Sequence, residues 1–145
     1  MRRVFYHSFL GLFFLFSGCS PSSSEDFHRE GKARCKELIQ VLGKIENREQ
    51  LLAAEPQLKT HFESLITLMI DAREFEQRHL DEEAEEEVVV DSGLDAKLEE
   101  ELRRVYAIEG GREVIERSQH EALIRLDAYE RTLAKKKEQL KNLYR

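Results

Sequence analysis

Two pairs of acidic and histidine side chains have spacings that metal sites on helices use. Glu76 and His79 are three residues apart and Glu116 and His120 are four apart, so each pair would share one helix face. A di-metal site inside a helical bundle needs two Glu-x-x-His pairs and two further acids. Glu76 and His79 adjoin an acidic run, which favours a solvated helix end, while Glu116 and His120 fit a surface pair. We therefore predict no metal and no cofactor.

The acidic run itself holds six carboxylates in the seven positions 81–87. Calcium is the ligand that such a run suggests. However, the spacing lacks the alternating oxygen ligands and the internal glycine of a helix-loop-helix calcium loop. Like charges at this density repel one another, so we predict an exposed connection between helices.

Nucleophilic chemistry has little support in the sequence. Cys35 falls on the apolar stripe of the first predicted helix, which favours a small buried hydrophobic residue, and an intermolecular disulfide is the alternative. No histidine stands where it would clearly serve as its base. Gly-x-Ser-x-Gly, phosphate-binding glycine loops and Cys-x-x-Cys are absent. We predict that the protein is not an enzyme.

The first residues have the layout of a secretory signal. Arg2 and Arg3 precede a largely apolar run of 13 residues from Val4 to Phe16. A membrane-spanning helix needs about 20 apolar residues, so a permanent transmembrane segment is the poorer interpretation. Phe16-Ser17-Gly18-Cys19 then follows, and this motif resembles the lipobox of bacterial lipoproteins, with Phe16 where Leu is usual.

The resemblance implies cleavage before Cys19 and lipid on that cysteine. It divides the chain into a signal peptide (1–18), a lipid-anchored tether (19–24) and a helical domain (25–145). In lipoproteins of bacteria with two membranes, Asp after the cysteine implies the inner membrane. Ser20 occupies that position here, so the resemblance slightly favours the outer membrane. A plain secretory peptide cut near Gly18 is the alternative.

Charge limits the choice of partners. Removing residues 1–18 leaves 21 basic and 29 acidic side chains, a net charge of 21 − 29 = −8. A nucleic-acid partner is excluded because phosphate backbones require clustered Lys and Arg. Broad adhesion to anionic lipid is disfavoured for the same reason, so membrane contact is expected through the lipid on Cys19.

Apolar residues recur at steps of three and four, which predicts helices. The first stripe runs from Phe27 to Ile45, after a cap by Ser22 with Glu25 or Ser23 with Asp26. A second helix is expected from Asn47, kinked or restarted at Pro56, to about His79. Ser92 is the predicted cap of the last helix.

The last helix is expected to be long and similar to a coiled coil. A continuous helix from Leu94 to Asn142 would span ~74 Å, although Gly110 and Gly111 could bend it. One end should therefore lack a companion inside the chain. Near-heptad spacing predicts a seam there that binds a protein partner or a second copy. Its residues are Leu126, Tyr129, Leu133 and Leu140.

The sequence therefore predicts an all-α fold, a helical hairpin or three-helix bundle. The expected function is that of a membrane-anchored lipoprotein of the cell envelope, acting as a structural or protein-interaction subunit. The alternative is a periplasmic, chaperone-like helical protein that binds clients. An open apolar groove would favour the chaperone, and a closed bundle with a protruding seam would favour the subunit.

Overall fold

The computed structural model describes residues 21–79 and 92–143, and the regular structure in these segments is entirely helical. The helices are α1 (Ser24–Leu42), α2 (Arg48–Arg78), α3 (Ser92–Tyr106) and α4 (Gly111–Leu143). The predicted all-α fold is confirmed, with four helices in place of the expected two or three. The signal peptide, Cys19 and the acidic run 81–87 lie outside the described residues.

Local capping sets where α1 and α2 begin. The Ser23 hydroxyl accepts a hydrogen bond from the Asp26 backbone N–H at 3.1 Å, and the Asn47 side chain accepts one from the Gln50 N–H at 3.0 Å. The Gln50 side chain in turn accepts a hydrogen bond from the Glu46 N–H at 2.7 Å. These bonds satisfy N–H groups that no carbonyl inside the helix can reach. Both caps are among those predicted from the sequence.

α2 passes through Pro56 as one helix of 31 residues. Of the two outcomes expected for this proline, a restart of the helix is therefore not observed. Proline removes one hydrogen bond of the helix, and tertiary packing must offset that loss. The face of α2 that is buried around Pro56 supplies this packing through Leu51, Leu58, Phe62 and Ile66.

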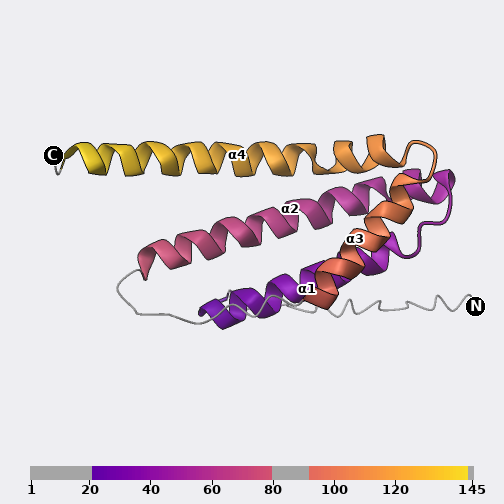
Figure 1. Cartoon of the computed structure of the whole chain (residues 1–145), viewed down its shortest axis with the longest axis horizontal. Helices are drawn as coiled ribbons and strands as arrows, with labels where there is room; N and C mark the ends of the chain where they lie inside the picture. Colours follow the sequence, from indigo (N-terminus) through magenta and orange to yellow (C-terminus); the bar gives the residue numbers. More distant parts are fainter. Residues whose placement is uncertain (1–20, 80–91, 144–145) are drawn as a thin grey trace, which may run out of the picture.

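α1 and α2 form an antiparallel hairpin (Figure 1). The ring centroids of Phe27 and Phe75 are 5.5 Å apart, and further along the hairpin Arg34 donates a hydrogen bond to the Ser64 hydroxyl. We call the end with the α1–α2 connection the turn end. The opposite end, where α1 begins and α2 finishes, is the open end.

α4 lies against another side of α2 and runs in the same direction. Near the turn end the Arg117 guanidinium donates to Glu55 at 2.7 Å, and further along Arg73 donates to Glu130 at 2.7 Å. At the open end α4 continues past the finish of α2 (Figure 1).

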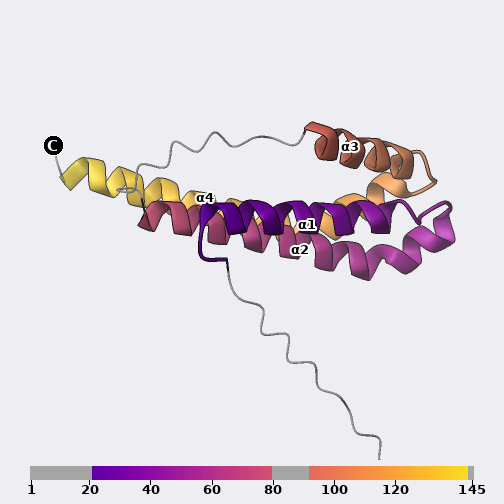
Figure 2. The same ribbon diagram turned by 90° about the horizontal axis from the view of Figure 1, so that it is seen from below.

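α3 lies along α1 and contacts the start of α4 (Figure 2). Its last turn is attached to the α1–α2 connection, because the Arg104 guanidinium donates to the carbonyl oxygens of Leu42, at 2.6 Å, and of Ile45. The guanidinium thus bonds the last carbonyl group of α1 and one carbonyl group of the α1–α2 connection, and so fixes the end of α3 to this connection.

The core is concentrated at the turn end. Beyond Ile66 of α2 and Ala122 of α4, no described side chain is buried, and α1 has no buried side chain before Leu38. Each fully buried leucine or isoleucine contributes about 1.5–3 kcal/mol to the stability of the fold. The side chains with at most 1% of their surface exposed are Leu38, Leu42, Ile45, Leu51, Leu58, Val105 and Ile115.

The predicted long last helix is confirmed as α4, which has 33 residues, but it begins at Gly111 and not near Leu94, because the chain reverses between α3 and α4. Gly110 has φ +77°, and the Gly111 N–H donates to the Ile108 carbonyl oxygen at 2.8 Å. A Cβ on Gly111 would stand 2.0 Å from the Val105 carbonyl oxygen, closer than any side chain tolerates. The two glycines thus allow a turn that is too tight for other residues.

Candidate functional site

An apolar groove of about 380 Å³ lies toward the open end, between α1, α2 and the start of α3. Positions 24, 27, 28, 31 and 35 of α1 are three or four residues apart, so they share the face that lines it. Gly31 leaves room there, because an added Cβ would meet only the Leu68 Cδ2 atom, at 3.8 Å. The apolar walls are formed by Phe27, Gly31, Cys35, Leu68, Met69, Ala72, Phe75 and Leu94.

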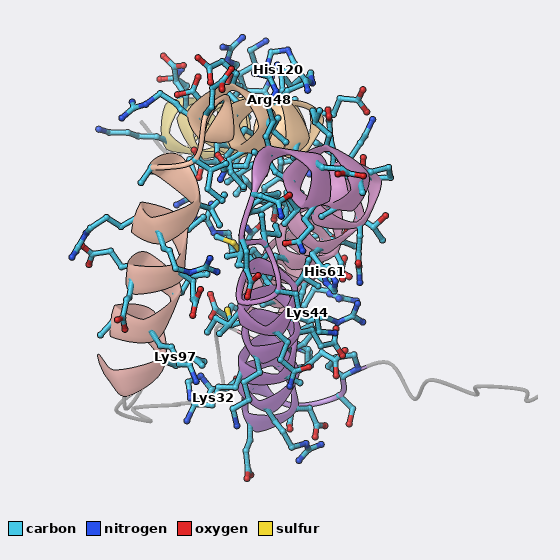
Figure 3. The ribbon with its side chains drawn as sticks, turned by 90° about the vertical axis from the view of Figure 1, so that its right-hand side faces the viewer. Lys32, Lys44, Arg48, His61, Lys97 and His120 are labelled. Carbon is cyan, nitrogen blue, oxygen red and sulfur yellow. The ribbon has the colours of Figure 1, made fainter. Side chains whose placement is uncertain are left out.

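Polar side chains border this apolar groove. His28, Lys32, Glu76 and Asp95 line it together with Ser24. Figure 3 labels Lys32 on α1 and Lys97 on α3, which flank the space between these two helices. An apolar floor with a few polar groups around it is the usual composition of a binding groove, and the volume is near the lower end of the range of about 300–1,000 Å³ for small-molecule sites.

Cys35 contributes to the groove as a neutral thiol. The side chain is half-buried rather than fully buried as its stripe position had suggested. Burial raises the pKa of the Cys35 thiol, and the nearby Asp95 carboxylate raises this pKa further. Because the thiolate is the reactive form, these surroundings suppress nucleophilic chemistry at Cys35.

The metal-ligand pairs considered from the sequence do not meet. Glu116 is next to Arg117, which binds Glu55, and Glu55 is 21 residues before Glu76 along α2, a separation of about 30 Å. His120 projects from the outer side of α4 (Figure 3). The His79 ring stacks on Phe75, with centroids 4.1 Å apart. 

Glu25 and His28 form a further Glu-x-x-His pair with the same spacing, which is not among the pairs predicted from the sequence. It stands at the start of α1, at the same end of the hairpin as Glu76 and His79. His28 and Glu76 both line the groove. Within residues 21–79 and 92–143, however, no three His, Cys, Asp or Glu side chains gather closely enough to hold a metal ion.

A second hollow, of about 390 Å³, lies at the turn end. Arg48 and Glu109 line it and form an ion pair, and Arg117 at its edge is bound by Glu55. Three of its four charged side chains, Arg48, Glu109 and Arg117, are therefore paired within the chain. We regard this hollow as part of the junction between α2 and α4.

The four predicted seam residues have different surroundings. Leu126 packs against the core, and the Tyr129 hydroxyl accepts a hydrogen bond from Gln77 Nε2 at 3.4 Å, so both contact α2 or its neighbours within the chain. Leu133 is half-buried, and the Leu140 side chain lies outside the described set. A partner on this seam would therefore meet chiefly its last part.

That last part belongs to what we call the α4 extension, residues 131–143. The hydrogen bonds and ion pairs between α2 and α4 end at Glu130, and Figure 1 shows α4 continuing beyond α2. Apart from half-buried Leu133, its described side chains are exposed, and Leu143 is 79% exposed.

Comparison with known proteins adds no relative. No family model, curated protein or solved structure matches this chain. None of the described helices has a stretch that is both apolar and long enough to span a bilayer.

Proposed function

We propose that the protein is a lipid-anchored lipoprotein of the bacterial cell envelope that acts as a binding subunit. Lipid on Cys19 holds it at a membrane, with the outer membrane favoured, and the groove between α1, α2 and α3 receives an apolar segment of a partner protein. The observation that carries the proposal is this groove, which presents apolar side chains from three helices in a chain with 36% charged residues.

An open apolar groove was the feature expected of a chaperone, but the small size of this groove supports a specific partner. At about 380 Å³ it has room for a few side chains, which suits one short segment better than the varied surfaces of many clients. Met69 is 42% exposed on its wall and is adaptable in shape, as methionines at binding surfaces are. The polar rim offers both signs of charge, from Lys32 and from Glu76 and Asp95.

The test of the anchor is metabolic labelling with a fatty-acid probe. We expect label on the wild-type protein and none on Cys19→Ala, together with a mature N-terminus at residue 19. Equal labelling of both proteins, or recovery of a chain that begins at Met1, would refute the anchor.

The test of the groove is photo-crosslinking in intact cells from a benzoylphenylalanine placed at Met69. The matched control is the same residue at Ile124, which is 56% exposed on α4 outside the groove. We expect a discrete protein adduct from position 69 that is absent from position 124. Gly31→Leu, which fills the groove, should abolish the adduct, whereas Gly31→Ala should keep it. The same adducts at both positions would contradict the proposal.

A chaperone-like client binder is the second candidate, and it is favoured by the openness of the same groove. It predicts many adducts from position 69 in place of one. It also predicts that bound segments exchange quickly, so that an unlabelled excess of client displaces a labelled one within the time of mixing.

A further inference from the structure

The α4 extension carries an excess of positive charge. Residues 131–143 contain five basic side chains and one acid, Glu138, a net charge of 5 − 1 = +4. Arg131 forms an ion pair with Asp127 at 2.6 Å. The four lysines have no acid within ion-pair distance among the described residues. They are Lys135, Lys136, Lys137 and Lys141.

The rest of the contact between α2 and α4 shows how cations in this chain are normally accommodated. Lys59 pairs with Glu121 at 2.8 Å, and Arg73 pairs with Glu130 at 2.7 Å. Such exposed pairs neutralise charge even where they add little stability. In the described structure this neutralisation stops after Arg131, so the lysines of the extension are available to an external anion.

The extension lies at the end of the molecule from which the lipid tether leaves. α1 begins beside the finish of α2, where Phe27 contacts Phe75, and α4 passes the same level near Glu130. Figure 1 shows the start of α1 and the finish of α4 at the same end of the molecule. The start of α1, to which the tether is joined, and the extension therefore lie at the same end.

The reach of the tether at the start of α1 and the length of the α4 extension also agree. Ser24 is five residues from Cys19, so an extended tether carries the lipidated residue up to about 17 Å from the start of α1. Leu143 is 13 residues past Glu130, which places the tip of α4 about 20 Å beyond the last contact with α2. A membrane that holds Cys19 at the reach of its tether is thus within reach of the tip of α4.

We propose that the α4 extension is a second membrane contact, whose lysines bind anionic lipid headgroups of the bilayer that holds the lipid on Cys19. The inference rests on the proposed lipid anchor. Each lysine near an anionic surface strengthens binding to that surface about fivefold. The contact is local, so it is compatible with a net charge of −8 over the mature chain.

Pairing with a second copy is a poorer match for the extension, because each of the two segments would carry a net charge of +4 and they would repel one another. An acidic protein segment, including the chain's own residues 81–87, is an occupant that the experiment must distinguish from lipid. Its signature is a contact that persists on a neutral bilayer.

The experiment uses the lipidated mature protein with Leu143→Cys in a Cys35→Ala background, labelled with an environment-sensitive fluorophore. It is inserted into vesicles of phosphatidylcholine, or of equal parts phosphatidylcholine and phosphatidylglycerol. We expect the anionic vesicles to shield the label from an aqueous quencher at least tenfold better. About 1 M salt, where the Debye length is near 3 Å, should remove the difference. A label at Ile124→Cys should respond to neither change.

Two variants with the same change in charge separate a local contact from general electrostatics. Replacing the four lysines of the extension by Gln should abolish the shielding. Replacing four exposed cations elsewhere should preserve it, and these are Lys36, Lys44, Lys97 and Arg103. Circular dichroism checks that both variants keep their helix content.

The outcomes also separate this inference from the anchor. If the protein does not sediment even with neutral vesicles, the lipid anchor has failed. If it sediments but the label at position 143 is equally exposed on both vesicles, the membrane contact is refuted and the anchor stands. Shielding that is the same on neutral and anionic vesicles would show an occupant other than anionic lipid and would likewise overturn the inference.

Discussion

Substituting the glycines between α3 and α4 distinguishes the reversed chain from a continuous helix. In Gly111→Ala the new Cβ would stand 2.0 Å from the Val105 carbonyl oxygen, and real contacts of this kind are essentially never below 3.0 Å. The turn must therefore open by at least 3.0 − 2.0 = 1 Å. That movement would disturb the Gly111 to Ile108 hydrogen bond and the packing of fully buried Val105 and Ile115.

Overpacking of this kind should lower the free energy of unfolding of Gly111→Ala by about 3 kcal/mol. Gly110→Ala should cost less, about 1–2 kcal/mol, because nothing lies within 4 Å of its Cβ and only the backbone conformation at φ +77° is unfavourable. Gly31→Ala is the control, because it should change the free energy of unfolding in the opposite direction. It lies inside α1 with ordinary contacts, so it should stabilise the protein by about 0.5–1 kcal/mol.

The assay is urea denaturation of the mature protein, followed by circular dichroism at fixed pH. The expected order of the free energy of unfolding is Gly31→Ala, wild type, Gly110→Ala, Gly111→Ala, from most to least stable. A continuous helix from α3 into α4 predicts the reverse for the two turn glycines, since alanine is the better helix former by about 1 kcal/mol. Stabilisation by Gly110→Ala and Gly111→Ala would therefore refute the reversed chain.

Three further predictions concern packing, reactivity and pH. Leu51→Ala should lower the free energy of unfolding, measured by urea denaturation, by about 2–5 kcal/mol because Leu51 is fully buried. The control Leu52→Ala, at a position 47% exposed, should change it by under about 0.5 kcal/mol. Iodoacetamide should alkylate Cys35 more slowly in the folded than in the unfolded protein at the same pH, because the fold raises the pKa of the thiol and half-buries the side chain. Equal rates of alkylation would contradict both the raised pKa and the burial. The hydrogen bond from Arg117 lowers the pKa of Glu55, so this pair stabilises the fold above the ordinary value of 4.5 and the contribution disappears as pH falls below it. The urea midpoint of Glu55→Gln should accordingly depend less on pH between neutral pH and about 3 than that of the wild type.

Features with a local cause were predictable from the sequence. Ser23 and Asn47 cap helices because a short polar side chain reaches an N–H three residues ahead, and this depends on little outside that turn. The periodic apolar residues likewise determined the faces of α1 and α2. The groove side of α1 was not recognised as open, because Phe27, Gly31 and Cys35 continue the same stripe as buried Leu38.

Features with a tertiary cause were not predictable. Gly110 and Gly111 were identified as a weak point, but the direction of the chain after them depends on how Val105, Val114 and Ile115 pack together. The parallel pairing of α2 with α4 has the same origin, since its ion pairs join residues about 60 positions apart. Consequently Leu126 was predicted to face a partner, whereas it packs against the chain's own core.

The distribution of burial gives the two ends of the molecule different physical roles. At the turn end, buried side chains from all four helices or their connections supply most of the hydrophobic stabilisation. Toward the open end the described helices diverge from this core and have no buried side chain, so contacts there add little to the stability of the fold. Regions with few buried apolar contacts are those that open or rearrange at low cost. Both proposed contacts, the groove and the α4 extension, lie toward this end, where a partner or a lipid surface can bind without disturbing the core at the turn end.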